Sequence, residues 1–573
     1  MASSPPPPPQ HVVVLGGGLT GLSAAFHLAR LDPTVRITLL EKDARMGGWV
    51  RSERVDVHDD DGNSASILLE AGPRTVRANT KSVLELIHLL HLEPHTITTP
   101  RSSPAARARF LHVPPTPGLL ALPSSLWSLL TSPLSRIILP ALLREPFRPA
   151  NRPTGATDES LDAFLTRRFG PAFARVLGSA FCHGVYGADA RVLSVRAAFP
   201  ALWDAEARGN GSVLLGELGW RAWWTAKDRR REREAREREE AWELSADPAF
   251  VRRVDEAAVI SFKDGLEQLV LALVAALESN PRVELRRGAE VVSLRPTEDG
   301  QTLEIRVADD TAAPLVATHV ISALPLPALA PALPPSAPLP HLLANTSSTM
   351  HVFTLVFATA RLPAPLHPPG FGYLVPRPLR GYTAVADSAP PPDAEKRLDV
   401  DVGIDDEPGL LGVVFDTASL AEQDAPTGGP AASGAGAPPF VKLTAMLGGP
   451  YPPPSFHPTT PHLALSSVLA AVARQLGHPS PSLPVSASAS PSGASLPPPV
   501  HAHHHTHARC IPTYAVGHVQ RMAELRAALQ RAPWGGRLRV VGAGVGGVSV
   551  GDCVKGGREA ARGLVGDRAG LRA

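Results

Sequence analysis

The chain has 573 residues, which is enough for two or three domains that each bury a core. Its 56 basic and 54 acidic side chains nearly cancel, so the charge balance gives no support for a nucleic-acid partner. The widely spaced cysteines, Cys182, Cys510 and Cys553, exclude a disulfide framework and a CxxC metal site.

Proline is abundant and clustered. The 61 prolines are about twice the average usage, and we interpret their clusters as loops inserted into an ordinary fold. The leader MASSPPPPPQ lacks the basic and apolar regions of a secretory signal. The most apolar stretch, residues 119–143, contains three prolines and Arg136, so we expect no membrane-spanning helix.

Both ends of the chain contain a strand that runs into a glycine turn and then into a helix. Residues 11–15 are apolar and precede GGGLTG, residues 19–31 have helical spacing, and residues 35–40 form a second apolar strand. This β-α-β pattern opens a doubly wound parallel sheet. RLRVVGAG at residues 537–544 repeats the strand and turn, and residues 549–565 repeat the helix, so we expect both ends to meet in one domain.

Between the two ends the pattern changes several times. We expect helices at residues 82–92, 119–147 (in short pieces) and 161–185, and strands within 283–320 and at 349–357, 410–415 and 441–447. The Arg/Glu run at 228–243 is interpreted as a solvated helix, because its charges nearly cancel and pair at i,i+4 spacing. Stretches rich in Pro, Ala, Gly and Ser are expected to be mobile, at residues 390–406, 421–439 and 479–508.

The first glycine turn has the spacing of a dinucleotide-binding motif. In GxGxxG the first glycine permits the tight turn, the second a close approach to a pyrophosphate, and the third close packing of helix on strand. The N-terminus of the helix that follows the turn favours the negatively charged pyrophosphate. Glu41 ends the second strand, where a carboxylate accepts hydrogen bonds from a ribose. We therefore predict nucleotide contacts from Gly16, Gly17, Gly18, Leu19, Thr20, Gly21 and Glu41.

The segment after Glu41 favours FAD over NAD. Its sequence, KDARMGGWVR, places a glycine pair shortly after the ribose acid and so resembles the amine-oxidase-like flavoproteins. Arg45 offers a positive charge for the pyrophosphate. A plain surface turn is the alternative for this segment by itself. EAGPRT at residues 70–75 resembles the next flavin-contacting strand end, so the predicted contacts are Lys42, Arg45, Gly48, Trp49, Gly72, Pro73, Arg74 and Thr75.

The second glycine turn is VGAGVGGV, at residues 541–548. In the same superfamily such a turn meets the flavin ring, and a helix N-terminus there stabilises the negative charge of reduced flavin. A second nucleotide site is the alternative, but no downstream strand with a ribose acid follows. We therefore expect one non-covalent FAD per chain, contacted also by Val291, Val541, Gly542, Gly546, Gly547 and Val548.

Several longer segments resemble the oxygen-dependent protoporphyrinogen oxidases of haem biosynthesis. They are VVVLGGGLTGLSAAFHL, EKDARMGGWVRS, LEAGPRTVR, ARFLHV, FCHGVYGAD, FGYLVP and IPTYAVGH followed by VVGAGVGGVSVGDCV. The resemblance covers nearly the whole chain apart from the inserts. It implies that FAD takes electron pairs from protoporphyrinogen IX in three rounds and passes them to O₂, which yields protoporphyrin IX and three H₂O₂.

The same resemblance implies the substrate residues. Arg109 matches an arginine that pairs with a substrate propionate, and Gly184 matches a backbone position near the tetrapyrrole centre. Phe371 and Leu374 match apolar walls of the macrocycle site, although ordinary core packing explains them equally well. We assign no role to the His183 side chain and no general base, since hydride can leave to the flavin while pyrrole protons pass to solvent.

The predicted fold class is α/β, with a Rossmann-type FAD-binding domain, a mixed α+β substrate domain and an α-helical membrane-binding region. The FAD-binding domain is expected from three segments, residues 10–100, 251–320 and 511–573. Residues 101–250 are expected to form the helical membrane-binding and substrate region, with a charged insert at 226–245. Residues 321–510 are expected to form the substrate-binding domain with its low-complexity inserts.

Location and partners follow from the resemblance. The apolar segment 119–147, with Trp127, Phe147 and the basic fringe of Arg136, Arg144 and Arg148, suits attachment to a membrane surface. Core helices around the substrate cavity are the alternative. We expect a peripheral protein of the mitochondrial inner membrane that faces the intermembrane space, with a plastid membrane as the alternative. Ferrochelatase and a second copy of the chain are candidate partners.

Two features are set aside. HAHHHTH at residues 501–507 lies in a Ser/Pro-rich stretch without fixed geometry, so we predict no metal site. Cys553 is interpreted as a packed thiol. The alternative functions are another FAD enzyme of the amine-oxidase or desaturase type and a non-catalytic flavin- or porphyrin-binding protein.

Overall fold

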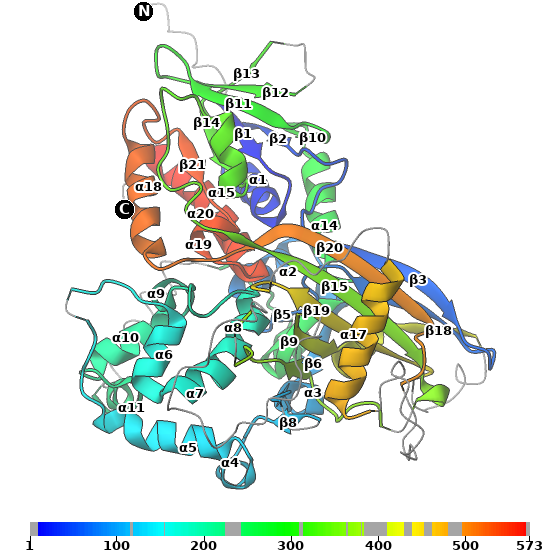
Figure 1. Ribbon diagram of the computed structural model, residues 1–573. Coiled ribbons are helices and arrows are strands. Elements are labelled where there is room, and N and C mark those ends of the chain that lie inside the picture. Colours follow the sequence, from blue (N-terminus) through cyan, green and yellow to red (C-terminus); the bar gives the residue numbers. More distant parts are fainter. Residues whose placement is uncertain are drawn as a thin grey trace, which may run out of the picture.

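The fold is known from a computed structural model. It describes residues 10–114, 118–153, 155–223, 242–308, 313–362, 365–379, 381–382, 409–428, 438–451, 461–478 and 496–568. Figure 1 shows one sheet with its helices in the upper part, a helical region at the lower left and a second sheet at the lower right.

The upper sheet is parallel and is built from both ends of the chain. Its described strands run in the order β10, β2, β1, β14, β21. They are β1 (His11–Leu15), β2 (Arg36–Leu40), β10 (Val283–Arg286), β14 (His319–Ser322) and β21 (Leu538–Val540). Val12, Val13 and Val14 are fully buried, as expected for a strand that is covered on both faces. The predicted Rossmann-type sheet from both chain ends is confirmed.

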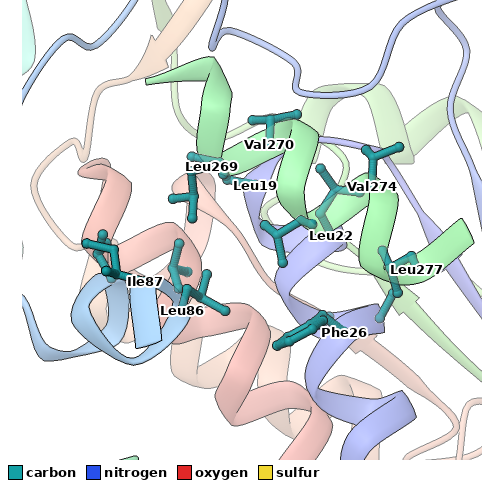
Figure 2. Packing of buried hydrophobic residues seen from close by; sticks show 14 of the residues in the cluster. Leu19, Leu22, Phe26, Leu86, Ile87, Leu269, Val270, Val274 and Leu277 are labelled. Carbon is teal, nitrogen blue, oxygen red and sulfur yellow. The ribbon is translucent and has the colours of Figure 1, made fainter. Parts of the chain in front are cut away.

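Helices cover one face of this sheet. They are α1 (Leu19–Leu31), α2 (Lys81–Leu89), α14 (Glu267–Glu278) and α20 (Val550–Arg568). Leu22 and Phe26 of α1 lie in one apolar cluster with Leu269 of α14 (Figure 2). Helix α20 comes so close to α1 that a Cβ on Gly557 would lie 2.3 Å from the carbonyl oxygen of Thr20. The two helices that follow the two glycine turns therefore pack in direct contact.

A small antiparallel sheet and further helices cover the opposite face. They are β11 (Val291–Pro296), β12 (Leu303–Val307), β13 (Leu315–Ala317), α15 (Leu326–Leu329) and α18 (His518–Gln530). Val13 of β1 packs in one cluster with Leu303, Ile305 and Met522 of these elements. The strands expected within residues 283–320 are confirmed as β10 to β14.

The lower sheet is mainly antiparallel, in the order β20, β15, β19, β17, β16, β7, β8. The strands are β7 (Phe110–Leu111), β8 (Leu120–Ala121), β15 (Ser347–Ala358), β16 (Gly372–Leu374), β17 (Leu410–Phe415), β19 (Phe440–Gly448) and β20 (His501–Pro512). Helix α17 (Pro461–Leu476) packs Val468 and Val472 against one face, next to Phe353. The hairpin of β3 (Ser52–His58) and β4 (Ser64–Glu70) packs against the other.

The histidine-rich segment corrects one of our expectations. Residues 501–507 belong to strand β20, which pairs with β15 in an antiparallel register that sets His505 opposite Val352. The ring of His504 stacks on Phe353 at 4.1 Å between centroids. The expected mobile stretch 479–508 is thus a regular strand over residues 501–508, because backbone pairing with β15 outweighs its composition. Residues 479–495 lie outside the described residues. Among the described residues, no three His, Cys, Asp or Glu side chains converge in a metal-binding arrangement.

Other connecting segments also form regular elements. Within the expected mobile stretch 421–439, β18 (Ala425–Gly428) pairs with β4, which corrects that expectation for its first part. The expected mobile stretch 390–406 lies outside the described residues. A third small sheet consists of β5 (Val76–Arg77), β9 (Ala257–Phe262) and β6 (Thr96–Pro100). Short helices complete this part, α3 (Pro104–Arg107), α13 (Pro248–Asp255) and α16 (Asp416–Leu420), while α19 (Ala543–Gly546) lies in the second glycine turn, before α20.

The helical region follows β8. It contains α4 (Leu126–Thr131), α5 (Ser135–Arg144), α6 (Leu161–Phe169), α7 (Pro171–Phe173), α8 (Ser179–Tyr186), α9 (Val195–Ala198), α10 (Pro200–Arg208) and α11 (Val213–Trp223). The fully buried Arg168 bonds Glu145 at 2.8 Å and holds α6 to the end of α5. Most of the Arg/Glu run expected at 228–243 lies outside the described residues. None of the described helices combines the length and the apolar character needed to cross a bilayer.

Candidate functional site: two glycine turns and a neighbouring substrate region

The two glycine turns lie side by side. Strands β1 and β21 flank β14 in parallel, so both turns leave the same edge of the sheet. A Cβ on Gly542 would lie 3.7 Å from Thr20 Oγ1, in the first turn. Ligands of such sheets bind outside the carboxyl ends of the strands, at the point where the strand order reverses, which here lies between β1 and β14. This edge is therefore the place for a dinucleotide.

The first turn combines close packing with one open position. A Cβ on Gly21 would lie 1.9 Å from the carbonyl oxygen of Gly16, and one on Gly17 would lie 2.3 Å from Met46 Sδ. A Cβ on Gly18 would meet nothing within 4 Å. Gly18 is also the N-cap of α1, and no side chain caps that helix. The turn thus presents uncapped N–H groups next to free space, which fits a pyrophosphate.

Glu41 is tied to the first turn by its carboxylate. Oε2 accepts from the N–H of Gly17 at 2.6 Å, and Oε1 accepts from the N–H of Asp43 at 3.0 Å. The N–H of Ala289 donates to the carbonyl of Glu41 at 2.7 Å, and this contact brings β11 with Val291 toward the acid. Lys42 is exposed. The structure therefore gathers the predicted acid, the glycine turn and the strand of Val291 at one end of the sheet.

Arg45 has a bonding pattern that the sequence did not predict. Its Nη1 donates to the carbonyl of Val50 at 2.8 Å and to Glu267 Oε1 at 2.9 Å, and its Nη2 donates to the carbonyl of Gly48 at 2.7 Å. The N–H of Gly47 donates to the carbonyl of Gly17 at 2.8 Å. Arg45 therefore holds the loop of the glycine pair against the first turn, and Glu267 offsets its charge. Glu267 carries no motif, so no local signal could have identified it.

The turn at residues 71–75 links this edge to the lower sheet. A Cβ on Gly72 would lie 2.2 Å from the carbonyl oxygen of Trp49, so glycine is needed for the two loops to pack. The ring of Trp49 is 44% exposed and contacts the ring of His507 edge-on, at 5.1 Å. Pro73 and Thr75 are half-buried. Trp49 thus keeps a large aromatic surface free beside the turns.

Arg74 is buried and forms an ion pair with Asp416 of α16 at 2.7 Å. Thr444 donates to the other carboxylate oxygen at 2.6 Å. The Arg74 Nη2 atom is buried and has no partner among the described residues, which leaves a donor for a ligand. The predicted flavin-side residue is therefore also a link to the lower sheet, through Asp416, which the sequence did not reveal.

The second turn is shaped by positive φ angles. Gly542 and Gly547 have φ of +108° and +136°, which side chains rarely adopt, and a Cβ on Gly547 would lie 2.5 Å from Asp552 Cγ. A Cβ on Gly546 would meet nothing within 4 Å. Val541 and Val548 are half-buried beside these glycines. Burial raises the pKa of the Cys553 thiol to about 11, so this neighbouring thiol is neutral. The open faces at Gly18 and Gly546 fit an FAD that the two turns share.

The predicted substrate residues lie on adjacent elements. A Cβ on Gly184 of α8 would lie 2.8 Å from Leu374 Cδ2, so helix and strand are in contact there. The N–H of Phe371 donates to the carbonyl of Ala108 at 3.0 Å, next to Arg109. Arg109 is exposed and donates to the carbonyl of Ala106 at 3.0 Å. The structure thus brings Gly184 to Leu374, and Phe371 to the backbone beside Arg109.

His183 is buried between two partners. Its Nδ1 lies 2.7 Å from the carbonyl of Val375, and its Nε2 lies 2.8 Å from the hydroxyl of Tyr382. Since the carbonyl can only accept, Nδ1 carries the proton and Tyr382 donates to Nε2. Burial lowers the pKa of His183 to about 4, so the ring is neutral at physiological pH. It is not an accessible base.

Comparison with known families assigns the class of this fold and site. The model of the family described as flavin containing amine oxidoreductase matches residues 19–394. The chain therefore belongs to the flavin-containing amine oxidoreductases.

Full-length relatives narrow this assignment to one group. The protoporphyrinogen oxidase of Homo sapiens is 32% identical over 96% of this chain and 97% of its own, and that of Schizosaccharomyces pombe is 27% identical over the same shares. A putative protoporphyrinogen oxidase from Exiguobacterium superposes with a TM-score of 0.65 at 20% identity, over 97% of this chain and 98% of its own. Within the family, the chain groups with the protoporphyrinogen oxidases.

Proposed function

We propose that the chain oxidises protoporphyrinogen IX to protoporphyrin IX, with one non-covalently bound FAD per chain and O₂ as the final acceptor. Six hydrogens leave the porphyrinogen in three rounds, and three O₂ become three H₂O₂, so atoms and electrons balance. The full-length similarity to curated protoporphyrinogen oxidases carries this proposal. The meeting of the two glycine turns, which the similarity by itself does not explain, supports it.

The residues at the sheet edge hold the cofactor in this proposal. Bound FAD supplies the two-electron oxidation chemistry. The N–H groups at the start of α1, beside Gly18, bind the pyrophosphate, and the Glu41 carboxylate binds the ribose. The open face of Gly546 and the N-terminus of α20 approach the flavin from the other side. Trp49, with its exposed ring, closes the site between them.

The substrate residues orient the macrocycle. Arg109 presents an exposed guanidinium, whose planar fork binds a propionate in a bidentate manner. Leu374 and Phe371 provide apolar walls. Gly184 has no side chain, and a Cβ there would collide with Leu374, so glycine lets α8 pack directly on this apolar wall.

Proton transfer in this proposal needs no side-chain base. His183 is held neutral by burial, with its pKa lowered to about 4, and both ring nitrogens are occupied. Protons released from the substrate therefore pass between pyrroles and to water. Alanine variants around Gly184 that bind FAD and substrate yet lose all turnover would contradict this.

An exposed apolar patch suggests where the protein meets a membrane. Trp127 of α4, Leu143 of α5 and Phe147 are 75%, 69% and 88% exposed. Helices α4 and α5 lie at the end of the molecule opposite the parallel sheet (Figure 1). Basic side chains on the same segment, Arg136 and Arg144, suit anionic headgroups. We propose peripheral attachment there, at the mitochondrial inner membrane on its intermembrane-space side, where ferrochelatase would be a neighbour.

One assay tests the proposed activity against its alternatives. The purified chain with bound FAD is mixed with protoporphyrinogen IX in air, and protoporphyrin fluorescence and H₂O₂ are followed together. We expect three H₂O₂ per protoporphyrin, and no turnover of amines. Amine turnover without porphyrin formation would favour another flavin enzyme. Bound FAD that stays oxidised when substrate is added without O₂ would favour a binding protein without turnover.

A further inference from the structure

The motif IPTYAVGH, residues 511–518, joins β20 to α18 and passes beneath the second glycine turn. The hydroxyl of Tyr514 donates to the carbonyl of Ala543, at the start of that turn. The rings of Tyr514 and His518 are stacked, at 4.1 Å between centroids and 15° between planes. Both side chains are almost fully buried, at 2% and 3% exposure. This pair therefore supports the turn from the protein side, away from the open face of Gly546.

His518 is held in one orientation and one protonation state. The Nδ2 of Asn345 donates to His518 Nδ1 at 2.9 Å, while the Asn345 oxygen accepts from Arg521 at 3.3 Å. Nδ1 therefore accepts, and the proton of the neutral ring lies on Nε2. Burial lowers the pKa of His518 to about 4, and the Val545 backbone opposes that shift. The imidazole is thus a neutral group that stacks on Tyr514, whose hydroxyl contacts the turn.

The motif is also anchored to the helical region. The N–H of Ser194 donates to the carbonyl of Tyr514 at 2.7 Å, and the N–H of Gly517 donates to Asp158 at 2.6 Å. The ring of Tyr186 on α8 contacts Tyr514 edge-on, at 6.0 Å. Tyr514 and His518 therefore cannot shift without moving neighbours that also position α8.

The turn needs such support because of its composition. It contains Gly542, Gly544, Gly546 and Gly547, and glycine loses more backbone freedom on ordering than any other residue. Few side chains of its own are available to hold it. The backbone N–H groups of the turn bind a ligand well only when their directions are already fixed before the ligand binds.

We propose that Tyr514 and His518 are positioning residues that fix the second glycine turn and thereby set the affinity and the spectrum of the bound flavin. This inference rests on the proposed FAD site. It is independent of the substrate, because its test measures FAD binding without porphyrinogen.

The test is Tyr514→Phe, which removes the hydroxyl and keeps the ring. FAD is titrated into apoprotein and followed by flavin fluorescence, absorption spectrum and reduction potential. We expect FAD to bind about three- to tenfold more weakly, as for the loss of one hydrogen bond, with a displaced absorption maximum and a changed potential. Tyr186→Phe is the matched control, because its hydroxyl donates to the carbonyl of Ala198, away from the turn. We expect unchanged FAD binding in that control.

A second variant keeps the inference testable if Tyr514→Phe folds poorly. Asn345→Ala removes the hydrogen bond to His518 Nδ1 without changing the turn or Tyr514. We expect weaker FAD binding with a smaller spectral change. Unchanged affinity and spectrum in both variants would overturn the inference, and so would an equal loss in Tyr186→Phe. If the wild-type chain binds FAD but does not oxidise porphyrinogen, the proposed substrate fails while the inference about the turn stands.

Discussion

The two glycine turns have similar sequences and different supports. The first is fixed locally: Gly21 packs on the carbonyl of Gly16, and the N–H of Gly17 donates to Glu41, all within one β-α-β unit. The second is held from outside its own strand-turn-helix unit, by the Tyr514 hydroxyl on the carbonyl of Ala543 and by His518, which stacks on Tyr514. The first turn is therefore held mainly within one β-α-β unit, with Arg45 and Glu267 bracing the adjoining loop, whereas the second turn also depends on Tyr514 from the segment before α18.

Substitution of Gly21 breaks the first turn and has the largest expected effect. In Gly21→Ala the new Cβ would lie 1.9 Å from the carbonyl oxygen of Gly16, so α1 must move away from β1. We expect purified protein without FAD and a loss of about 1–3 kcal/mol in the free energy of unfolding. Absorbance at flavin wavelengths and urea unfolding measure both. Gly556→Ala, on α20, is the matched control, since its Cβ enters open space and Gly556 is not among the proposed FAD contacts. FAD retained in Gly21→Ala would contradict the close packing required in the first turn.

Substitution of Gly18 tests whether the first turn faces a ligand. A Cβ on Gly18 meets no protein atom within 4 Å, so Gly18→Ala should leave the stability of apoprotein within about 1 kcal/mol. If the pyrophosphate occupies that space, FAD should bind at least about tenfold more weakly, as overpacking predicts. Titration of apoprotein with FAD measures this. Unchanged affinity would place the pyrophosphate elsewhere.

Substitution of Arg109 tests the proposed substrate site and leaves both glycine turns unchanged. In Arg109→Ala we expect KM for protoporphyrinogen to rise about tenfold, as for the loss of a charged hydrogen bond, with unchanged FAD affinity. Steady-state kinetics measure this. Arg107→Ala is the control, because Arg107 is also exposed and its Nε donates to the carbonyl of Arg101. If the control raises KM and Arg109→Ala does not, the neighbouring arginine binds the propionate.

Glu70 is expected to affect stability alone, through a pH dependence. Burial raises the pKa of Glu70 to about 7, against hydrogen bonds from Ser52 and the N–H of Leu266. The folded state therefore keeps this proton to higher pH than the unfolded state, and the stability it contributes is lost as pH rises from about 4.5 to 7. Relative to Glu70→Gln, the wild type should lose about 1–3 kcal/mol over this range. Urea unfolding of both proteins at several pH values measures the difference. The prediction is contradicted if the free energies of unfolding of wild type and Glu70→Gln change with pH in parallel.

Much of the cofactor side was predictable from the sequence, because its signals are local. A β-α-β unit, its glycines and Glu41 lie within one short stretch, where spacing along the chain translates directly into position in space. That RLRVVGAG joins the same domain was predictable too, since a buried parallel strand has a recognisable apolar pattern, although its partner strand β14 was not.

Contacts between segments that are distant in the sequence could be seen only in the tertiary structure. Glu267 meets Arg45, Asp416 meets Arg74, and Tyr514 meets Ala543 because the sheets and helices bring them together. Strand β20 shows the same effect on the backbone, since HAHHHTH becomes a strand by pairing with β15 against the indication of its composition. Local sequence patterns show which chemical groups a segment carries. Burial and pairing with segments distant in the sequence determine the conformation of the segment and the contacts of those groups.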